Sequence, residues 1–311
     1  MLAELQDPMD ISSLRELVEQ EIESVLELPQ VCEPLRSAVR YAVLGGGKRI
    51  RPLFVLGLAI DIGRDPLDVL HRAVALELIH CSTLVHDDLP ALDDDDFRRN
   101  QPSCHKKFGE ATALLAGDFL IGLAQQCVLS VRSGVSDTLG AKCSRLLAQS
   151  FCDVCEGQQI DILEHVSIEE ILSLHMKKTA TLFRAALAFS VIGHLQETKL
   201  FPLAEELGNA VGMYFQAADD FIDAYGGTKD RGRPESSDVK NERITLFSKE
   251  NEEAGERLLT QHEEEVERAL ASFLAQLPTK TELPIFSQLM GQLELRVAEV
   301  RKRLLNSVST Q

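Results

Sequence analysis

Two groups of aspartates are the residues of this chain with the clearest capacity for chemistry. One lies within residues 87–96 and the other within residues 219–223. Each follows an apolar run, and carboxylates crowded together repel one another and lose solvation. A divalent metal ion that also binds an anion would compensate these charges, because hard cations prefer oxygen ligands. The two groups therefore predict a metal-dependent site, of which they would form two walls.

The spacing within the second group favours a shared metal ion. Asp219 and Asp223 are four residues apart, so a helix places both carboxylates on one face. The alternative is a solvated acidic helix end that binds no ligand. We favour the metal site because both groups follow apolar runs and because cations accompany them.

The first group needs an irregular backbone. Asp87 and Asp93 are six residues apart, which on a regular helix would point their side chains about 240° from each other. Pro90 lies between them and disfavours a regular helix. We therefore expect a break near Pro90 that lets Asp93 or Asp94 rejoin Asp87 and Asp88.

Cationic residues are a second feature that could hold phosphates. The segment GGGKRIRP at 45–52 joins a glycine-rich turn to cations at an expected helix start, where backbone N–H groups also attract anions. Its spacing differs from that of a nucleotide P-loop. Further cation pairs stand at 98–99 and 177–178. Together with the aspartates, they predict two diphosphates, one bound through metal and one bound directly by cations.

The composition limits the remaining possibilities. A chain of 311 residues with 44% hydrophobic content can bury a large core, and a net charge of −17 disfavours nucleic acid as a partner. Three of the first ten residues are acidic, unlike a signal peptide. The seven cysteines fit reduced core thiols. We therefore expect a cytoplasmic protein.

The elements that must position these residues are expected to be helices. Helical periodicity dominates and no alternating run predicts a sheet. Helices at 71–86, 111–131, 180–193 and 207–222 are apolar on most faces and predict a central layer, whereas those at 12–27 and 252–274 are amphipathic and predict an outer layer. Asp118 and Gln125-Gln126 favour a core helix at 111–131 over a transmembrane segment. Residues 226–242 predict a charged loop that could act as a lid.

These motifs resemble those of the trans-isoprenyl diphosphate synthases of the farnesyl and geranylgeranyl type. The resemblance covers about residues 30–247. It rests on GGGKRIRP at 45–52, the aspartates at 87–93 with Arg98-Arg99, Gly157-Gln158, Lys178-Thr179, and Phe215-Gln216 before Asp219-Asp220 and Asp223. It implies an isoprenoid synthase-like fold: a single all-α domain, residues 1–311, in which central helices surround a deep apolar cavity.

The resemblance also implies a prenyltransferase that condenses isopentenyl diphosphate head-to-tail with dimethylallyl, geranyl or farnesyl diphosphate through a carbocation. It implies Mg²⁺, three ions per active site, and a homodimer. The implied metal ligands are Asp87, Asp88, Asp93, Asp219, Asp220 and Asp223. The implied catalytic residues are these six aspartates and Lys178. The implied contacts to isopentenyl diphosphate are Lys48, Arg51, His80 and Arg99. Those to the allylic partner are Arg98, Lys178, Thr179, Gln216, Arg233 and Arg243.

The role expected for His80 depends on the resemblance alone, and four other positions differ from the pattern of the family. On position alone, His80 would be an ordinary core histidine. Arg233 and Arg243 stand where the family usually has lysines, and an arginine keeps the charge but changes the geometry. Ser236 and Phe247 replace a glycine and a proline that the family tends to have, so closure of this loop could differ.

The length of the product depends on the bulk below the first aspartates. Ser82 and Thr83, five and four residues before Asp87, are small where farnesyl-forming bacterial relatives usually have an aromatic residue. This predicts a deep cavity and geranylgeranyl diphosphate as the product. Phe119 could restore a floor, which leaves farnesyl diphosphate as the alternative.

Three other functions stay open at this point. A non-catalytic partner subunit would usually lack one aspartate group, and this chain has both. A metal phosphohydrolase built on His86-Asp87 would need mostly histidine ligands, whereas carboxylates dominate here. A terpene cyclase would not need Lys48 and Arg51 as a second cationic pocket.

Overall fold

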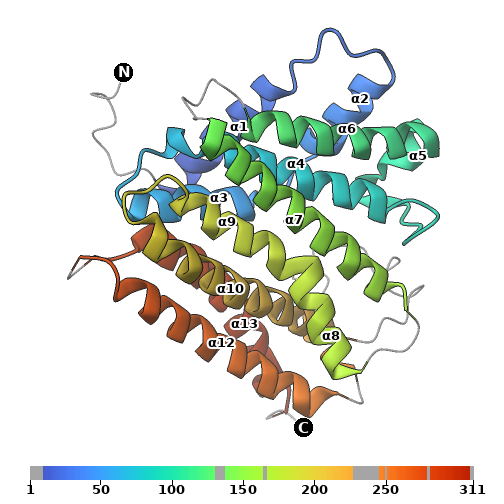
Figure 1. Ribbon diagram of the computed structural model, residues 1–311. Coiled ribbons are helices and arrows are strands. Elements are labelled where there is room, and N and C mark those ends of the chain that lie inside the picture. Colours follow the sequence, from blue (N-terminus) through green and yellow to red (C-terminus); the bar gives the residue numbers. More distant parts are fainter. Residues whose placement is uncertain are drawn as a thin grey trace. The chain divides into compact units, whose positions relative to one another are not determined.

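The fold is described from a computed structural model, and it is all-α as predicted (Figure 1). The structure describes residues 10–129, 137–163, 167–226, 245–248, 251–278 and 281–308. Its contacts divide the chain into two compact units, each made of three stretches. The first unit comprises Met1–Ala148, Ala186–Glu197 and Lys280–Phe286, and the second comprises Gln149–Ala185, Thr198–Thr279 and Ser287–Gln311. A single domain over residues 1–311 stays a prediction.

Helix α4 is the centre of the first unit. It packs against α1, α2, α3 and α6 (Figure 1), and most of its side chains are buried. The helices of this unit are α1 (Ile11–Val25), α2 (Leu35–Leu44), α3 (Ile50–Asp61), a 3₁₀ turn (Pro66–Asp68), α4 (Leu70–Asp87), α5 (Cys104–Phe108) and α6 (Glu110–Val128). The predicted central helix at 71–86 is thus confirmed.

Helix α1 has the amphipathic pattern expected of an outer helix. Its buried residues are Ile11, Leu14, Val18 and Ile22, at helical spacing. The Asp10 carboxylate accepts a 2.8 Å hydrogen bond from the Ser13 amide and so caps the first turn.

Helix α6 differs from the prediction of a helix buried on most faces. Ala113, Ala116 and Leu120 are buried on one face, but Leu114 and Leu115 are 48% and 56% exposed. Because both faces are apolar, the sequence pattern could not show that only one is covered. Among the described helices, this one is long and apolar enough to cross a membrane by length and composition.

One buried arginine and one aspartate connect distant segments of the first unit. Arg72 on α4 donates to the carbonyls of Phe189 and Ile192 at 3.1 and 2.7 Å. Asp61, at the end of α3, accepts from the amides of Ile285 and Phe286 at 3.2 and 2.8 Å. These bonds satisfy backbone groups at helix ends that would otherwise lack partners.

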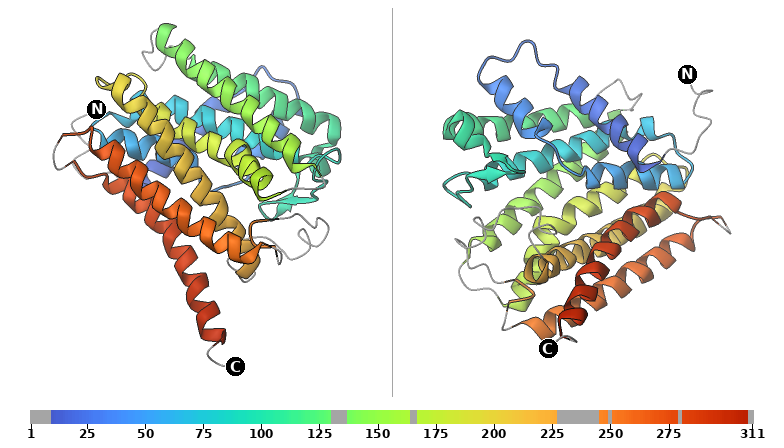
Figure 2. Two further views of the ribbon diagram at one scale, coloured as in Figure 1. Left: turned by 60° about the horizontal axis from the view of Figure 1, so that its bottom comes forward. Right: turned by 180° about the vertical axis from the view of Figure 1, so that it is seen from behind.

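The second unit is also helical. Its described elements are α8 (Ile168–Leu174), a π-helical segment (His175–Ala180), most of α10 (Glu197–Tyr225), α12 (Glu252–Leu274) and most of α13 (Pro284–Val308), while α7 (Asp137–Asp161) and α9 (Thr181–Val191) belong to both units. Helices α12 and α13 run side by side (Figure 2), and Arg301 pairs with Glu256 across them at 3.4 Å.

Pro202 lies within the first turns of α10, where it removes only one backbone hydrogen bond. One local expectation, that no sheet forms, was wrong. A short antiparallel hairpin, β1 (Phe97–Arg98) with β2 (Gln101–Pro102), forms. Two-residue strands are too short to produce an alternating sequence pattern. Four of the seven cysteines are buried, as expected of core thiols (Cys81, Cys104, Cys127 and Cys143), but Cys32, Cys152 and Cys155 are exposed.

Candidate active site

The first aspartate group has the predicted break. Helix α4 ends at Asp87, and the Asp93 amide donates to the Asp87 carbonyl at 2.9 Å. Asp94 follows with a φ of 49°, a left-handed conformation that aspartate tolerates better than most residues. The chain therefore returns to the end of α4, and Asp87 and Asp93, both partly exposed, lie close together.

Asp88 has a different environment from its neighbour Asp87. Its side chain is only 3% exposed and accepts from the Arg98 guanidinium, at 2.9 Å from Nε. Burial raises the pKa of Asp88 to about 6, against the opposing effect of Arg98. Its predicted role as a metal ligand stays a prediction, but in the structure its carboxylate is occupied by Arg98.

The hairpin after this group positions the two arginines differently. Arg99 and Asn100 have φ values of 53° and 62°, as in a tight two-residue hairpin turn. Arg99 reaches the glycine-rich loop and donates to the Gly46 carbonyl. A Cβ atom on Gly47, whose φ is 138°, would lie 2.9 Å from the Arg99 guanidinium. The loop thus needs glycine here so that Arg99 can pack against it.

His80 lies among the cations of the first unit. Burial lowers its pKa well below the ordinary value, and the charges of Arg51, Arg99 and Arg98 lower it further. A neutral His80 therefore borders a concentration of guanidinium groups in a protein with a net charge of −17. This is the type of local field that binds a small anion despite overall negative charge.

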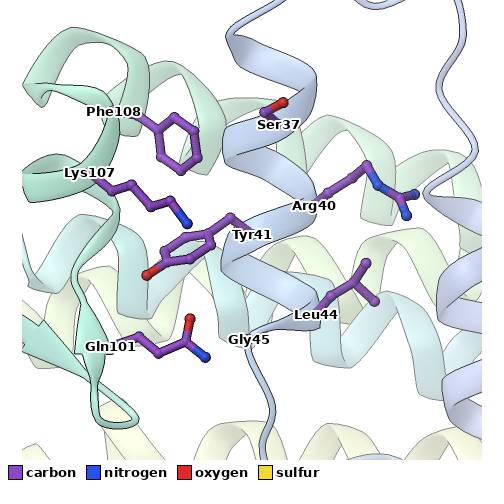
Figure 3. Close-up of a pocket in the computed structure, with 8 residues that line it drawn as sticks. All are labelled: Ser37, Arg40, Tyr41, Leu44, Gly45, Gln101, Lys107 and Phe108. Atoms are coloured by element: carbon purple, nitrogen blue, oxygen red, sulfur yellow. The ribbon is translucent and has the colours of Figure 1, made fainter.

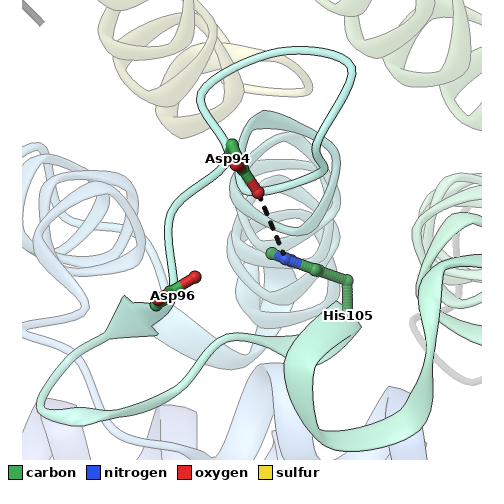
Figure 4. A group of neighbouring side chains, drawn as sticks. All are labelled: Asp94, Asp96 and His105. Carbon is green, nitrogen blue, oxygen red and sulfur yellow. Dashed lines mark ion pairs between the residues drawn. The ribbon is translucent and has the colours of Figure 1, made fainter. Parts of the chain in front are cut away.

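A separate grouping of possible metal ligands consists of Asp94, Asp96 and His105 (Figure 4). The His105 Nε2 atom is 3.9 Å from Asp94. Lys106 already neutralises these carboxylates, with its ammonium 2.7 Å from Asp96 and 3.8 Å from Asp94. Both aspartates are exposed, so the grouping is explained by these ion pairs.

The second aspartate group has one buried and two accessible carboxylates. Asp220 is 7% exposed, and its oxygens accept from the Gln216 amide at 2.9 Å and from the Leu246 backbone amide at 3.3 Å. His175 Nε2 lies 3.3 Å from the same carboxylate. Asp219 is partly exposed and Asp223 is exposed. Since α10 is a continuous helix, these two lie on one face as predicted.

Two of the predicted allylic contacts, Lys178 and Thr179, lie on the π-helical segment. Lys178 donates to Asp161 at 2.6 Å, and Thr179 donates to Gln216 at 2.8 Å. Segments of π-helix occur often at functional sites because they displace side chains from regular helical positions. The hydroxyl of Thr179 and the amide of Gln216 thus connect this segment to Asp220 on α10.

Gly157 on α7 lets the π-helical segment approach closely. A Cβ atom there would lie 2.5 Å from the Lys178 amide nitrogen and 2.8 Å from its Cα. No side chain fits in this space. The close approach of the Lys178 backbone therefore explains why the Gly157-Gln158 motif has glycine at position 157.

The structure places the other predicted residues as follows. Arg233, Ser236 and Arg243 lie outside the described residues. Phe247 is buried and packs edge-on against Phe221, with ring centroids 5.3 Å apart.

The predicted chain-length residues all lie in the first unit. Ser82 is fully buried, whereas Thr83 and Phe119 are partly exposed. Thr83 donates to the His80 carbonyl at 2.8 Å.

Three positioning residues were not predicted from the sequence. They are Arg49, Asp161 and His175. The partner of each lies 17 to 45 residues away in the chain, so no local sequence pattern marks the contact. Of the three, only Arg49 belongs to a motif singled out in the sequence, GGGKRIRP. The cations of that motif were predicted to bind substrate rather than to hold the loop.

One groove of the first unit lies apart from the predicted site residues. This groove, of about 490 Å³, is lined by Tyr41, Lys107 and Phe108 among others (Figure 3). Lys107 places its ammonium 3.7 Å from the centre of the Tyr41 ring. None of the predicted catalytic or substrate residues lines this groove.

The carboxylates of the two aspartate groups fit magnesium. Asp87 and Asp93 are brought together by the backbone, and Asp219 and Asp223 share a helix face. All four offer hard oxygen ligands, which suit Mg²⁺ better than a transition metal.

Comparisons with known proteins agree with these motifs. The sequence profile of the family described as Polyprenyl synthetase matches residues 32–273. A farnesyl diphosphate synthase from Micrococcus luteus is 37% identical over 229 residues, which cover 72% of this chain and 78% of the relative. Geranylgeranyl pyrophosphate synthase 12, chloroplastic, from Arabidopsis thaliana is 34% identical over 275 residues, covering 79% and 75%.

A solved structure gives the same result for the fold. The crystal structure of a geranyltranstransferase from Thermotoga maritima has a TM-score of 0.76 at 30% identity and covers 93% of this chain and 99% of the relative. Relatives that form farnesyl and geranylgeranyl products both occur among these proteins. The chain therefore belongs to the polyprenyl synthetase family and is a prenyltransferase of the trans-isoprenyl diphosphate synthase type.

Proposed function

We propose that this prenyltransferase condenses isopentenyl diphosphate head-to-tail with an allylic diphosphate and that its main product is geranylgeranyl diphosphate. The dimethylallyl, geranyl and farnesyl diphosphates are the candidate primers. The observation that carries the proposal is the first unit's pairing of two close, accessible aspartates, Asp87 and Asp93, with the cations around His80.

The cations would hold the isopentenyl diphosphate directly. Lys48 and Arg51 lie on the glycine-rich loop and at the start of α3, and Arg99 packs against that loop. Because His80 is neutral, it adds a hydrogen-bonding group without further charge. These groups orient the substrate so that its alkene faces the reacting carbon.

The family resemblance implies which residues would serve the allylic diphosphate. Asp87, Asp93, Asp219 and Asp223 would hold Mg²⁺, for which the family resemblance implies three ions. When bound, Mg²⁺ would stabilise the charge that develops on the departing diphosphate. Lys178 would add a positive charge to the same group from the π-helical segment. The proposed allylic contacts also include Arg98, Thr179 and Gln216, with Arg233 and Arg243 from outside the described residues.

The reaction balances without any further reactant. The carbon–oxygen bond of the allylic diphosphate breaks and leaves an allylic cation, which the alkene of isopentenyl diphosphate attacks. The new carbon–carbon bond lengthens the chain by five carbons. The product then loses a proton, which the released diphosphate accepts. Apolar walls must exclude water throughout, since water would otherwise capture the cation.

The product assignment rests on the small residues before the first aspartates. Thr83 lies one helical turn before Asp87 and is partly exposed. No aromatic side chain stands at either 82 or 83. Farnesyl diphosphate is the alternative product, with Phe119 as a possible floor.

The proposed function is tested with the purified chain, Mg²⁺, isopentenyl diphosphate and each primer in turn. Chain lengths are read by mass spectrometry of the products, with an EDTA-treated sample as the control. We expect twenty-carbon product from farnesyl diphosphate. Exclusive accumulation of fifteen-carbon product would contradict the chain length, and diphosphate release without any longer product would contradict the reaction.

We also infer a cytoplasmic homodimer. The exposed apolar side chains of Leu114 and Leu115 on α6 support a protein interface, and the buried thiols of Cys81, Cys104, Cys127 and Cys143 are compatible with a reducing compartment. Light scattering of the wild-type chain and of Leu115→Glu tests the dimer, and cell fractionation tests the location. A monomeric wild-type chain, or its recovery with membranes, would contradict these inferences.

A further inference from the structure

Arg49, in the GGGKRIRP segment, has its side chain buried in the core of the first unit. Only 1% of its side chain is exposed, whereas the adjacent Lys48 is exposed. Arg49 is the cap residue of α3 and has a φ of 51°. This left-handed conformation is costly for a residue with a Cβ atom, so the surrounding contacts must hold it in place.

The Arg49 guanidinium connects three helices. Its Nε and Nη2 atoms donate to the Glu19 carboxylate on α1 at 2.7 and 3.2 Å. Its Nη1 atom donates to Glu77 on α4 at 2.8 Å, and Nη2 also donates to the Val43 carbonyl on α2 at 2.8 Å. Four hydrogen bonds thus fix the end of the glycine-rich loop against α1, α2 and α4.

The charge of Arg49 is balanced inside the protein. Burial alone would lower its pKa, but the hydrogen bond with Glu19 and the charge of Glu77 raise the pKa of Arg49 above its ordinary value. Arg49 therefore stays charged and paired, and its guanidinium is not available to a substrate phosphate. A lysine could not replace these contacts, because a single ammonium cannot reproduce the planar fork that bridges two carboxylates and a carbonyl.

The backbone around Arg49 determines where its neighbours lie. Gly46 and Gly47 have φ values of 96° and 138°, so the loop before Arg49 has little stiffness of its own. Lys48 and Arg51 are one residue before and two residues after the anchored position. Fixing Arg49 thus fixes the direction in which both of these cations leave the backbone.

We propose that Arg49 is a positioning residue for isopentenyl diphosphate, which holds Lys48 and Arg51 in the arrangement that binds its diphosphate. This inference rests on the proposed function. The alternative is that Arg49 only stabilises the fold. The two differ in a clear way: positioning predicts a selective loss of affinity for isopentenyl diphosphate, whereas a purely structural role predicts a loss of stability alone.

The test compares Arg49→Lys with Arg72→Lys as the matched control. Arg72 is also buried in the first unit, but it donates to the Phe189 and Ile192 carbonyls and does not contact the loop. For each variant, urea unfolding gives stability, steady-state kinetics give KM for both substrates, and calorimetry gives the Kd of isopentenyl diphosphate without turnover. Glu19→Gln is a milder second variant, since the Glu19 side chain is 37% exposed.

We expect Arg49→Lys to raise KM and Kd for isopentenyl diphosphate about tenfold or more, which corresponds to about 1.4 kcal/mol. KM for farnesyl diphosphate should change less than about threefold. Glu19→Gln should give a smaller change of the same kind, and Arg72→Lys should lose stability without it. If Arg49→Lys does not fold, the affinity of Glu19→Gln for isopentenyl diphosphate decides between positioning and a purely structural role. Unchanged affinity in a folded Arg49→Lys, or equal changes for both substrates, would overturn the inference. If the wild-type chain binds isopentenyl diphosphate but forms no product, the proposed function fails instead.

Discussion

The backbone amide of Asp93 lies 2.9 Å from the carbonyl oxygen of Asp87 and donates a hydrogen bond to it. The chain thus leaves α4 at Asp87 and returns to the same point six residues later. This turn, rather than helical periodicity, brings the two carboxylates together. It also leaves Asp88, between them in sequence, directed into the protein toward Arg98.

Asp93→Asn should lower kcat about 100-fold or more and raise the Mg²⁺ concentration needed for half-maximal rate. The substitution removes a charged oxygen ligand but preserves shape, and stabilisation of a charged transition state is worth at least about 2.7 kcal/mol in such sites. Initial rates over a range of Mg²⁺ concentrations measure this. Asp94→Asn is the control, because Asp94 is 56% exposed and asparagine also tolerates its positive φ. An equal loss in both variants would argue against a specific role for Asp93.

Asp88→Asn should instead act mainly on stability. It leaves Arg98 without the charge of its buried partner, and because the Arg98 side chain is 21% exposed, the expected loss is about 1–3 kcal/mol rather than the larger cost of a fully buried pair. Urea unfolding without Mg²⁺ measures it. A variant with wild-type stability and a strongly raised Mg²⁺ requirement would show that Asp88 ligates metal directly.

The sequence could predict the break in the first aspartate group because its cause, Pro90, is local. It could also predict helix 252–274, whose bounds coincide with those of α12. It could not predict which carboxylates face the protein. Asp88 and Asp220 look like their neighbours in sequence, and their partners Arg98 and His175 reach them through a hairpin and a π-helical segment. Both features depend on tertiary contacts and leave no periodic pattern.

Gly157→Ala should reduce activity with the allylic substrate. The added methyl group would lie 2.5 Å from the Lys178 amide and push the π-helical segment away, so KM for farnesyl diphosphate should rise about tenfold and stability should fall by about 1–3 kcal/mol. Steady-state kinetics and urea unfolding measure both. Gly291→Ala, on α13, is the matched control, since beyond the neighbouring turns of its own helix the added Cβ atom meets nothing within 4 Å. Unchanged kinetics in Gly157→Ala would show that Lys178 does not depend on this close approach.

Thr83→Phe should shorten the product. Since α4 is regular through Asp87, Thr83 lies about 40° from Asp87 around the helix, and Ser82 lies about 140° from it. A ring at 83 would therefore block the space below the aspartates and change twenty-carbon product to fifteen-carbon product. Chromatography of the dephosphorylated products measures the distribution.

Ser82→Phe serves as the comparison for this prediction. Ser82 is fully buried, so a phenylalanine there should overpack the core and cost about 1–3 kcal/mol of stability. If Ser82→Phe shortens the product at full stability and Thr83→Phe does not, the growing chain follows the other face of α4.

His80→Gln should change how stability depends on pH. The pKa of His80 is lowered in the folded state by burial and by Arg51 and Arg99, so the unfolded chain binds its proton more readily. Between the ordinary histidine pKa of about 6.5 and the lower folded value, the unfolded state holds more protons, and wild-type stability must therefore fall as pH falls through this range. The slope contributed by one such group reaches about 1.4 kcal/mol per pH unit. Free energies of unfolding from pH 5.0 to 7.5 should decline less steeply in His80→Gln than in the wild type. Parallel pH profiles would mean that His80 accepts a proton as readily in the folded protein as in the unfolded chain, which is incompatible with its place among the guanidinium groups.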